Sequence, residues 1–271
     1  MLMDIKKIVF SPRIVLLLIA VITLSWVPVN PVSEVKYEMN KEHSVLSPLE
    51  LLKNEASAIY KNIKLENVGL SFNVFEEAYI GFLNLKNSNK INQDASILSI
   101  ADFDQSSKTK RLWIVDLDKD SLLLNTWVSH GRGSGNDMAT KFSNQSNSYQ
   151  SSLGFYVTGE VYSGKHGRSL RLDGMDNGFN DNARNRAIVL HGASYVSSQA
   201  IKSLNRLGLS HGCPAVPVEL TNEIIDLIKE KTVLYIHADS PAYHSVYLNY
   251  EEAGKRLLAY TNLDSTFQVG I

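Results

Sequence analysis

RLWIVDLDKDSLLLNTWV, residues 111–128, places two apolar runs on either side of the polar triplet Asp118-Lys119-Asp120. Short apolar runs joined by a turn-like linker are typical of a β-hairpin. Further strand-like segments lie at residues 97–103, 154–158, 170–172, 186–190 and 232–236. The pattern therefore predicts a mainly β domain, a β-rich α+β fold with short helices, over residues 95–238.

A small helical region, residues 47–90, is expected ahead of these strands. Ser47 is a candidate N-cap, Pro48 suits the first helical position, and Glu50 completes a capping box. A second amphipathic helix is expected after Ser71, and its simplest role is packing against the main domain. Shorter helices are predicted at 196–204 and 218–230. Residues 239–271 form a C-terminal extension without a clear pattern.

The N-terminal residues have the pattern of an export segment. Lys6, Lys7 and Arg13 precede the apolar run IVLLLIAVITLSWVPV, residues 14–29. A positive flank followed by an apolar segment predicts either a cleaved signal peptide or an uncleaved membrane anchor over residues 1–30. A polar linker, residues 31–46, follows. We therefore expect an exported protein of the periplasm or cell envelope, which touches the inner membrane only through this segment if the segment stays uncleaved.

The composition excludes some classes of partner. The net charge is −1, with 44% hydrophobic and 20% charged residues. The sequence has no basic stripe or tail, so nucleic acid is not an expected partner. It carries no indication of the oligomeric state.

Cys213 is the only cysteine of the chain and follows Ser210-His211-Gly212. A lone cysteine is often a small buried hydrophobe, but one flanked by glycine and histidine can also be a nucleophile. An oxidising compartment favours the second interpretation, because an exposed thiol is a liability there unless it is used. His191 follows the apolar run 187–190 and could be the base, with the backbone carbonyl of Gly192 orienting its ring.

Gly212 would let the backbone turn sharply beside the nucleophile and let a substrate carbonyl approach. Since Pro214 has no N–H, donors to an oxyanion must come from Cys213, Gly212 or His211. His211 could be catalytic or structural, and the structural role is favoured.

Two other histidines, His130 and His166, lie in glycine-containing loops and are expected to line a pocket or the surface. A metal site built from His166, His191, His211 and Cys213 is conceivable, but the sequence has no compact pair of ligands of the zinc kind. It therefore predicts no metal and no cofactor.

His191-Gly192, a helix and then Ser210-His211-Gly212-Cys213 resemble the signature of the L,D-transpeptidase (YkuD-like) catalytic domain. Residues 151–156, SSLGFY, are similar to that family's Thr-Pro-x-Gly-x-Phe strand. The segment Cys213-Pro214-Ala215-Val216 is most similar to the murein L,D-transpeptidase branch. The resemblance covers residues 95–237.

The resemblance implies a β-sandwich-like domain that acts on peptidoglycan stem peptides. Cys213 would be the nucleophile and His191 the base, Gly192 would orient the histidine, and Ser210, His211 and Gly212 would shape the oxyanion turn. The family usually has an apolar residue and then Arg or Asn after the cysteine, where this chain has Pro214 and Ala215. Substrate contacts would then come from elsewhere. The candidates are Tyr156, His166, Arg168, Arg171 and Arg186.

The expected activity is transfer of a stem-peptide acyl group through a thioester on Cys213 to an amine of a second stem. Two alternatives remain open. Water could replace the amine, which would make the protein an L,D-carboxypeptidase or hydrolase. The domain could also be a peptidoglycan-binding module that has lost catalysis.

Overall fold

The computed structural model describes residues 46–268, with side chains as far as residue 259. The predicted signal or anchor segment lies outside the described residues, as does the predicted linker apart from Leu46. Between residues 46 and 268, no helix combines the length and apolar character needed to cross a membrane.

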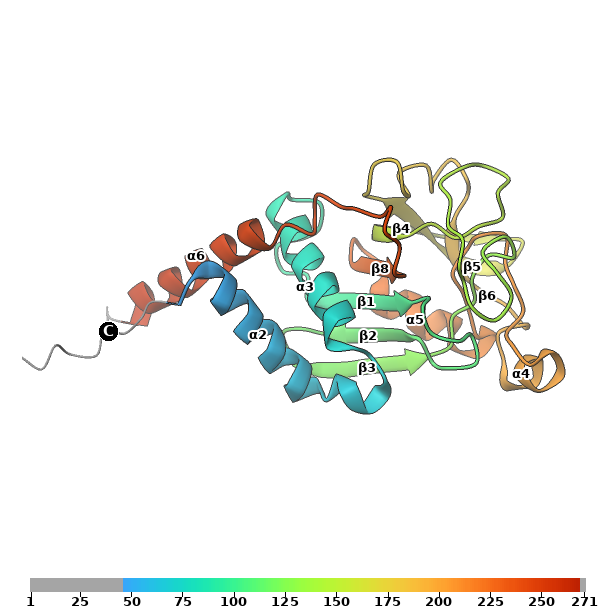
Figure 1. Cartoon of the computed structure of the whole chain (residues 1–271), viewed down its shortest axis with the longest axis horizontal. Coiled ribbons are helices and arrows are strands. Elements are labelled where there is room, and N and C mark those ends of the chain that lie inside the picture. The colour runs from blue at the N-terminus through green and yellow to red at the C-terminus, as the bar shows by residue number, and fades with distance from the viewer. Residues whose placement is uncertain (1–45, 269–271) are drawn as a thin grey trace, which may run out of the picture. The chain divides into compact units, whose positions relative to one another are not determined.

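One eight-stranded sheet forms the centre of the domain, in the order β3-β2-β1-β8-β4-β5-β6-β7 (Figure 1). Ser129, just after β3, bridges to Ala215 of β7 and so brings the two edges of the sheet together. The fold is therefore a mixed α+β structure with a nearly closed sheet, which confirms the predicted fold class. The strands are β1 (Ile97–Asp102), β2 (Leu112–Asp116), β3 (Ser121–Thr126), β4 (Gly154–Gly164), β5 (Gly167–Gly174), β6 (Val189–Gly192), β7 (Ala215–Val216) and β8 (Val233–His237).

The hairpin predicted at residues 111–128 is confirmed. β2 and β3 pair antiparallel, with Leu112 opposite Thr126 and Asp116 opposite Ser121. The turn between them is possible because Asp120 adopts a positive φ of 45°. That conformation is uncommon for residues other than glycine, and aspartate is one of the side chains that tolerate it best.

Helices lie on both faces of the sheet and at one of its ends. They are α2 (Pro48–Ile63), α3 (Phe72–Asn87), α4 (Ser198–Leu204), α5 (Thr221–Ile228) and α6 (Tyr250–Gln268), with short 3₁₀ turns η1 (Leu65–Val68) and η2 (Val218–Leu220). Figure 1 shows α2, α3 and α6 together, with α3 against β1, and α4 at the other end of the domain near β6. Ser47 and Glu50 form the predicted capping box. The tail, which shows no clear pattern in the sequence, contributes α6, which packs on α2 and α3.

The sheet is buried on both faces, because successive side chains of a strand point to opposite sides. On β4, Phe155 joins the core beneath α2, α3 and α6, whereas Tyr156 joins the core beneath α5. The first core is close-packed at Gly81 of α3, where a side-chain carbon would overlap the ring of Phe155. The helical region therefore shares one core with the sheet.

A polar contact also ties α3 to the sheet. His237, at the end of β8, lies between two carboxylates: Nδ1 is 3.2 Å from Glu77 of α3, and Nε2 is 3.3 Å from Asp104. Burial lowers the pKa of His237, but the hydrogen bond to Glu77 and the charges of the nearby carboxylates outweigh it, so the pKa is raised. A protonated His237 is thus stabilised in the folded chain.

Candidate active site

Neighbouring strands bring His191 and Cys213 together. β6 pairs parallel with β7, and His191 lies opposite Ala215 in that register. Cys213 is two residues ahead of Ala215, in the bend that leads into β7, and it lines the same cavity as His191. His191 is the third residue of β6 rather than the residue after a strand at 186–190. The shift arises because residues 181–187 form a run of turns that ends at Ala187, where φ is 54°.

The imidazole of His191 is buried and held in one tautomer. Its Nδ1 lies 3.0 Å from the carbonyl oxygen of Gly192 and donates to it, which leaves Nε2 as the acceptor. The ring also stacks on His166, with centroids 4.2 Å apart and an interplanar angle of 21°. Burial lowers the pKa of His191, and although the hydrogen bond to Gly192 raises it, the net pKa lies below the ordinary value. A neutral imidazole of this kind can accept a proton.

The thiol of Cys213 is half-buried, with Sγ 3.7 Å from the carbonyl oxygen of Ala187. Burial raises its pKa. A hydrogen bond from the Val189 backbone and the positive charges of Arg186 and Lys165 act in the opposite direction but do not offset the burial. The thiol is therefore protonated at rest and needs a base to become a nucleophile.

The turn before the thiol is braced from within. Gly212 has a φ of +122°, and a Cβ there would meet the carbonyl oxygen of Gln150 at 2.7 Å. Ser210 accepts the N–H of Gly212 at 3.0 Å and donates to the carbonyl of Cys213 at 2.6 Å. Of the three donors that the sequence allows, the N–H of Gly212 is thus already engaged. Within residues 46–268, the N–H groups of His211 and Cys213 form no hydrogen bond.

A second loop supports this turn from behind. Ser210 donates its N–H to the carbonyl of His130 at 3.0 Å, and Arg132 donates its N–H to the carbonyl of Ser210 at 2.9 Å. His130 is fully buried, and its Nδ1 accepts from the guanidinium of Arg111 at 2.7 Å. Burial lowers the pKa of His130 to about 4 and that of Arg111 to about 10. The expectation that His130 lines a pocket or the surface is therefore wrong, because its ring is a neutral acceptor inside the core.

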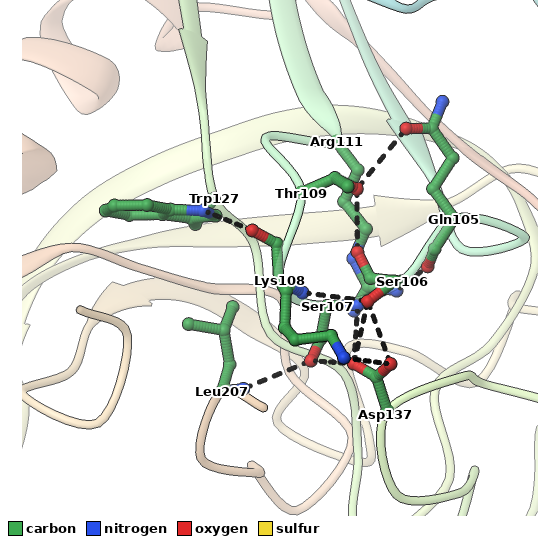
Figure 2. A network of polar contacts seen from close by, with 9 residues as sticks. All are labelled: Gln105, Ser106, Ser107, Lys108, Thr109, Arg111, Trp127, Asp137 and Leu207. Atoms are coloured by element: carbon green, nitrogen blue, oxygen red, sulfur yellow. Dashed lines mark hydrogen bonds and ion pairs between the residues drawn. The ribbon is translucent and has the colours of Figure 1, made fainter. Parts of the chain in front are cut away.

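The chain that leads to Ser210 is anchored by the carboxylate of Asp137 (Figure 2). The hydroxyls of Ser106 and Ser107 both donate to Asp137 at 2.8 Å. The hydroxyl of Ser107 also accepts the N–H of Leu207 at 3.1 Å. This network joins the β1–β2 loop to Leu207, three residues before Ser210, so it helps to position the turn that carries Cys213 without touching it.

Cys213 and His191 open into a cavity of about 540 Å³. It lies between the β4–β5 hairpin, β6 and the turn that carries the thiol. Among the described residues, no aspartate or glutamate lines it. The lining residues are Tyr162, Gly164, Lys165, His166, Arg186, Ala187, Ile188, Val189, His191, Tyr195, Leu209, Ser210, His211 and Cys213.

Three of the residues expected to contact substrate do not line this cavity. Tyr156 faces the core, and its hydroxyl donates to the carbonyl of Ser152 at 3.0 Å. Arg168 pairs with Asp226 at 2.7 Å, and Arg171 pairs with Glu160 at 3.0 Å. These three residues therefore lie outside the cavity lining, which the sequence could not show because it gives the residue types but neither the face of the strand nor the acidic partner.

Other expected residues do gather at the cavity. His166, Arg186, His211 and Ser210 line it, and Gly192 and Gly212 shape the backbone beside it. His211 packs edge-on against Tyr149, with centroids 4.8 Å apart, which fits its structural interpretation.

Lys165, Tyr162 and Tyr195 also line the cavity, although they are not among the residues expected from the sequence. Lys165 is at the tip of the β4–β5 hairpin, whose strands extend beyond the predicted segments to pair Gly164 with Gly167. The closely spaced glycines on either side of Lys165 and His166 are the signal that could have indicated this turn.

Metal-ligand spacing occurs elsewhere in the described residues. Asp102, Asp104 and His237 bring ligand atoms within 4.8 Å of one another, outside the cavity. His237 is engaged there in ion pairs with Glu77 and Asp104. Within residues 46–268, the four residues considered from the sequence for a metal site do not form such a group. They are His166, His191, His211 and Cys213.

Several known proteins are similar to this chain. The model of the L,D-transpeptidase catalytic domain (YkuD) family matches residues 66–237. None of the curated proteins compared matches the chain. Similar solved structures include an L,D-transpeptidase from Mycobacterium smegmatis, with 13% identity, a TM-score of 0.33 and coverage of 53% of this chain and 59% of that one. Another is an L,D-transpeptidase from Stackebrandtia nassauensis, with 13% identity, a TM-score of 0.33 and coverage of 72% and 94%.

This chain thus spans 59% of the length of the Mycobacterium smegmatis protein. The family model matches more than half of this chain and contains β1 to β8, the candidate base and the cysteine turn. The chain belongs to the L,D-transpeptidase (YkuD) catalytic domain family.

Proposed function

We propose that this protein is an exported cysteine L,D-transpeptidase that acts on peptidoglycan stem peptides through a thioacyl-enzyme on Cys213. The observation that carries the proposal is the meeting of a neutral, oriented His191 and the thiol of Cys213 in one cavity whose described lining has no acidic residue. Membership of a family of transpeptidases supports the substrate class. We assign catalysis to residues 95–238 and accessory roles to 47–90 and 239–271.

In the first half-reaction, Sγ of Cys213 attacks the carbonyl between a diamino acid and a terminal D-alanine. Nε2 of His191 accepts the thiol proton as the C–S bond forms. The N–H groups of His211 and Cys213 would bind the oxyanion of the tetrahedral intermediate. The C–N bond then breaks, His191 returns the proton to the leaving amine, and D-alanine departs from the thioester.

In the second half-reaction, an amine of another stem peptide attacks the thioester carbonyl. His191 takes a proton from that amine, the C–S bond breaks, and the proton goes to the departing sulfur. The products are a new amide cross-link and the free thiol of Cys213. Gly192 serves throughout by keeping the proton of the resting imidazole on Nδ1, so that Nε2 faces the reaction.

The localisation in the cell envelope follows from the substrate. Peptidoglycan is the substrate that the family implies, and the export segment expected at residues 1–30 would deliver the domain to it. We propose periplasmic or envelope location on these two grounds.

The decisive experiment compares the wild type with Cys213→Ala. Incubation with stem peptides or a carbapenem should add one acyl group to the wild type, measured by intact mass, and none to the variant. Retained acylation of Cys213→Ala would contradict the proposal. Analysis of the products formed from cell-wall digests, with and without an acceptor stem peptide, then separates the three candidate functions. A cross-linked dimer supports transpeptidation. A shortened stem peptide without any dimer would show that the protein is a hydrolase, and an unchanged stem peptide would show that it is a binding module.

A further inference from the structure

The charged residues that line the active-site cavity are all basic. Lys165 and Arg186 are its cationic lining residues, and no carboxylate of the described residues lines the cavity. A concave surface lined by one sign of charge concentrates ligands of the opposite sign. The cavity therefore favours a ligand that carries an anionic group near the reacting carbonyl.

Arg186 is committed to the protein itself. One terminal nitrogen donates to the carbonyl of Ser143 at 2.7 Å and to the hydroxyl of Ser152, and the other donates to the carbonyl of Gln150 at 2.7 Å. Its guanidinium is half-buried and closes the loop over residues 143–152. It could turn to a ligand only by leaving these acceptors behind, which makes Arg186 a structural cation.

Lys165 is differently placed. It is exposed at the tip of the β4–β5 hairpin, and within the described residues its ammonium forms no ion pair or hydrogen bond. The next residue, His166, stacks on His191, which fixes the hairpin tip beside the base. The charge of Lys165 lowers the pKa of both Cys213 and His191, which indicates that the ammonium lies within electrostatic reach of both reacting groups.

We propose that Lys165 is a specificity-determining residue that binds a carboxylate of the donor peptide beside Cys213. The proposal rests on the function above only for the identity of the donor. A stem peptide offers that carboxylate from two sources: its C-terminus, or the side chain of a third residue that carries an extra carboxyl group. An ammonium at this rim serves either source, because it acts as a rotatable point charge rather than a planar fork.

The first test uses the single thiol as a reporter and needs no turnover. Cys213 is alkylated by iodoacetate, an anion, and by iodoacetamide, its neutral analogue, and the ratio of the two rate constants is measured. Lys165→Ala should lower this ratio about fivefold at low salt, as expected for one nearby, partly solvated charge. Lys165→Arg should keep the ratio close to that of the wild type, and the effect should shrink as salt screens it.

The matched control is Lys202→Ala, another exposed lysine, on α4 and away from the cavity lining. Its alkylation ratio should equal that of the wild type. An unchanged ratio in Lys165→Ala, or an equal fall in Lys202→Ala, would overturn the proposal. Because alkylation does not require a peptide substrate, this result stands even if the protein proves not to be a transpeptidase.

The second test identifies the source of the carboxylate. The wild type and Lys165→Ala are compared on four tetrapeptide donors: free or amidated at the C-terminus, and with diaminopimelate or lysine at the third position. Loss of discrimination between acid and amide in the variant assigns the terminal carboxylate. Loss of discrimination between diaminopimelate and lysine assigns the side chain. If kcat/KM of the two proteins keeps the same pattern over all four donors, Lys165 does not bind the carboxylate, whereas no turnover by the wild type contradicts the proposed function instead.

Discussion

Replacing Gly212 by alanine should disable the nucleophile turn, at a cost that follows from its surroundings. At a φ of +122° the added Cβ meets the carbonyl oxygen of Gln150 at 2.7 Å. That oxygen cannot move freely, because Arg186 donates to it at 2.7 Å. Backbone strain of this kind costs about 1–3 kcal/mol. The overlap with a fixed backbone atom adds to it, so we expect a loss of roughly 3 kcal/mol, or about 6–12 °C in Tm for a domain of this size.

The larger effect should fall on chemistry. The strain can be relieved only by shifting the turn, and the turn carries the thiol of Cys213 and the free N–H groups next to it. A displacement of about 1 Å at a reacting centre commonly costs about a hundredfold in rate. The rate constant of acylation, followed by intact mass, should therefore fall at least that far in Gly212→Ala.

A matched variant separates this effect from backbone strain in general. Gly69 has a φ of +77°, and a Cβ added there would have no described atom within 4 Å, so Gly69→Ala carries only the cost of a left-handed alanine, about 1–2 kcal/mol. Its acylation rate should match that of the wild type. Acylation of Gly212→Ala at the wild-type rate, or a Tm that falls no further than that of Gly69→Ala, would show that the turn is not held as described.

Two further predictions concern pH. Because burial lowers the pKa of His191, the apparent pKa of the acid limb of kcat/KM should lie below about 6.5, the ordinary value for histidine. An acid limb at or above that value in the pH–rate profile would contradict the role of His191 as a buried neutral base. The raised pKa of His237 acts on stability: its contribution is complete below about 6.5 and is lost as pH rises through the folded-state pKa. Denaturant titrations across this range should show the free energy of unfolding of the wild type falling, and that of His237→Gln falling less; equal slopes would exclude His237 as the cause.

Much of the fold can be predicted from the sequence because local patterns agree with the tertiary structure. The apolar runs on either side of Asp118-Lys119-Asp120 form the predicted hairpin, and Ser47 caps α2 as its spacing indicates. The sequence also indicates that His191 lies near the end of a strand and Cys213 in a Gly-Cys turn, and β6 does pair with the strand that follows this turn. By contrast, α6 lacks a distinct apolar stripe, and its packing on α2 and α3 depends on the assembled core.

The substrate-facing residues cannot be predicted in the same way. An arginine in a sequence shows its charge but not its partner, and here Arg168 and Arg171 are taken by acidic neighbours from other segments. The course of β4 is equally non-local: the register shifts between Thr158 and Val161 before the strand continues to the hairpin tip. Such a register shift changes which side chains share a face of the strand, and alternation along the sequence does not reveal it.

The protonation state of Cys213 and His191 is the property of the site that the sequence predicts least. A neighbouring cysteine and histidine could rest as a thiolate and an imidazolium, as an ion pair ready to react. Here burial raises the pKa of Cys213 and lowers that of His191, so both shifts favour the neutral pair. In the proposed mechanism, the thiol loses its proton only as the bond to the substrate forms. A resting thiol of this kind also resists oxidation, because the thiolate is the form that oxidants attack, and this suits an unpaired cysteine in the compartment where the chain is proposed to work.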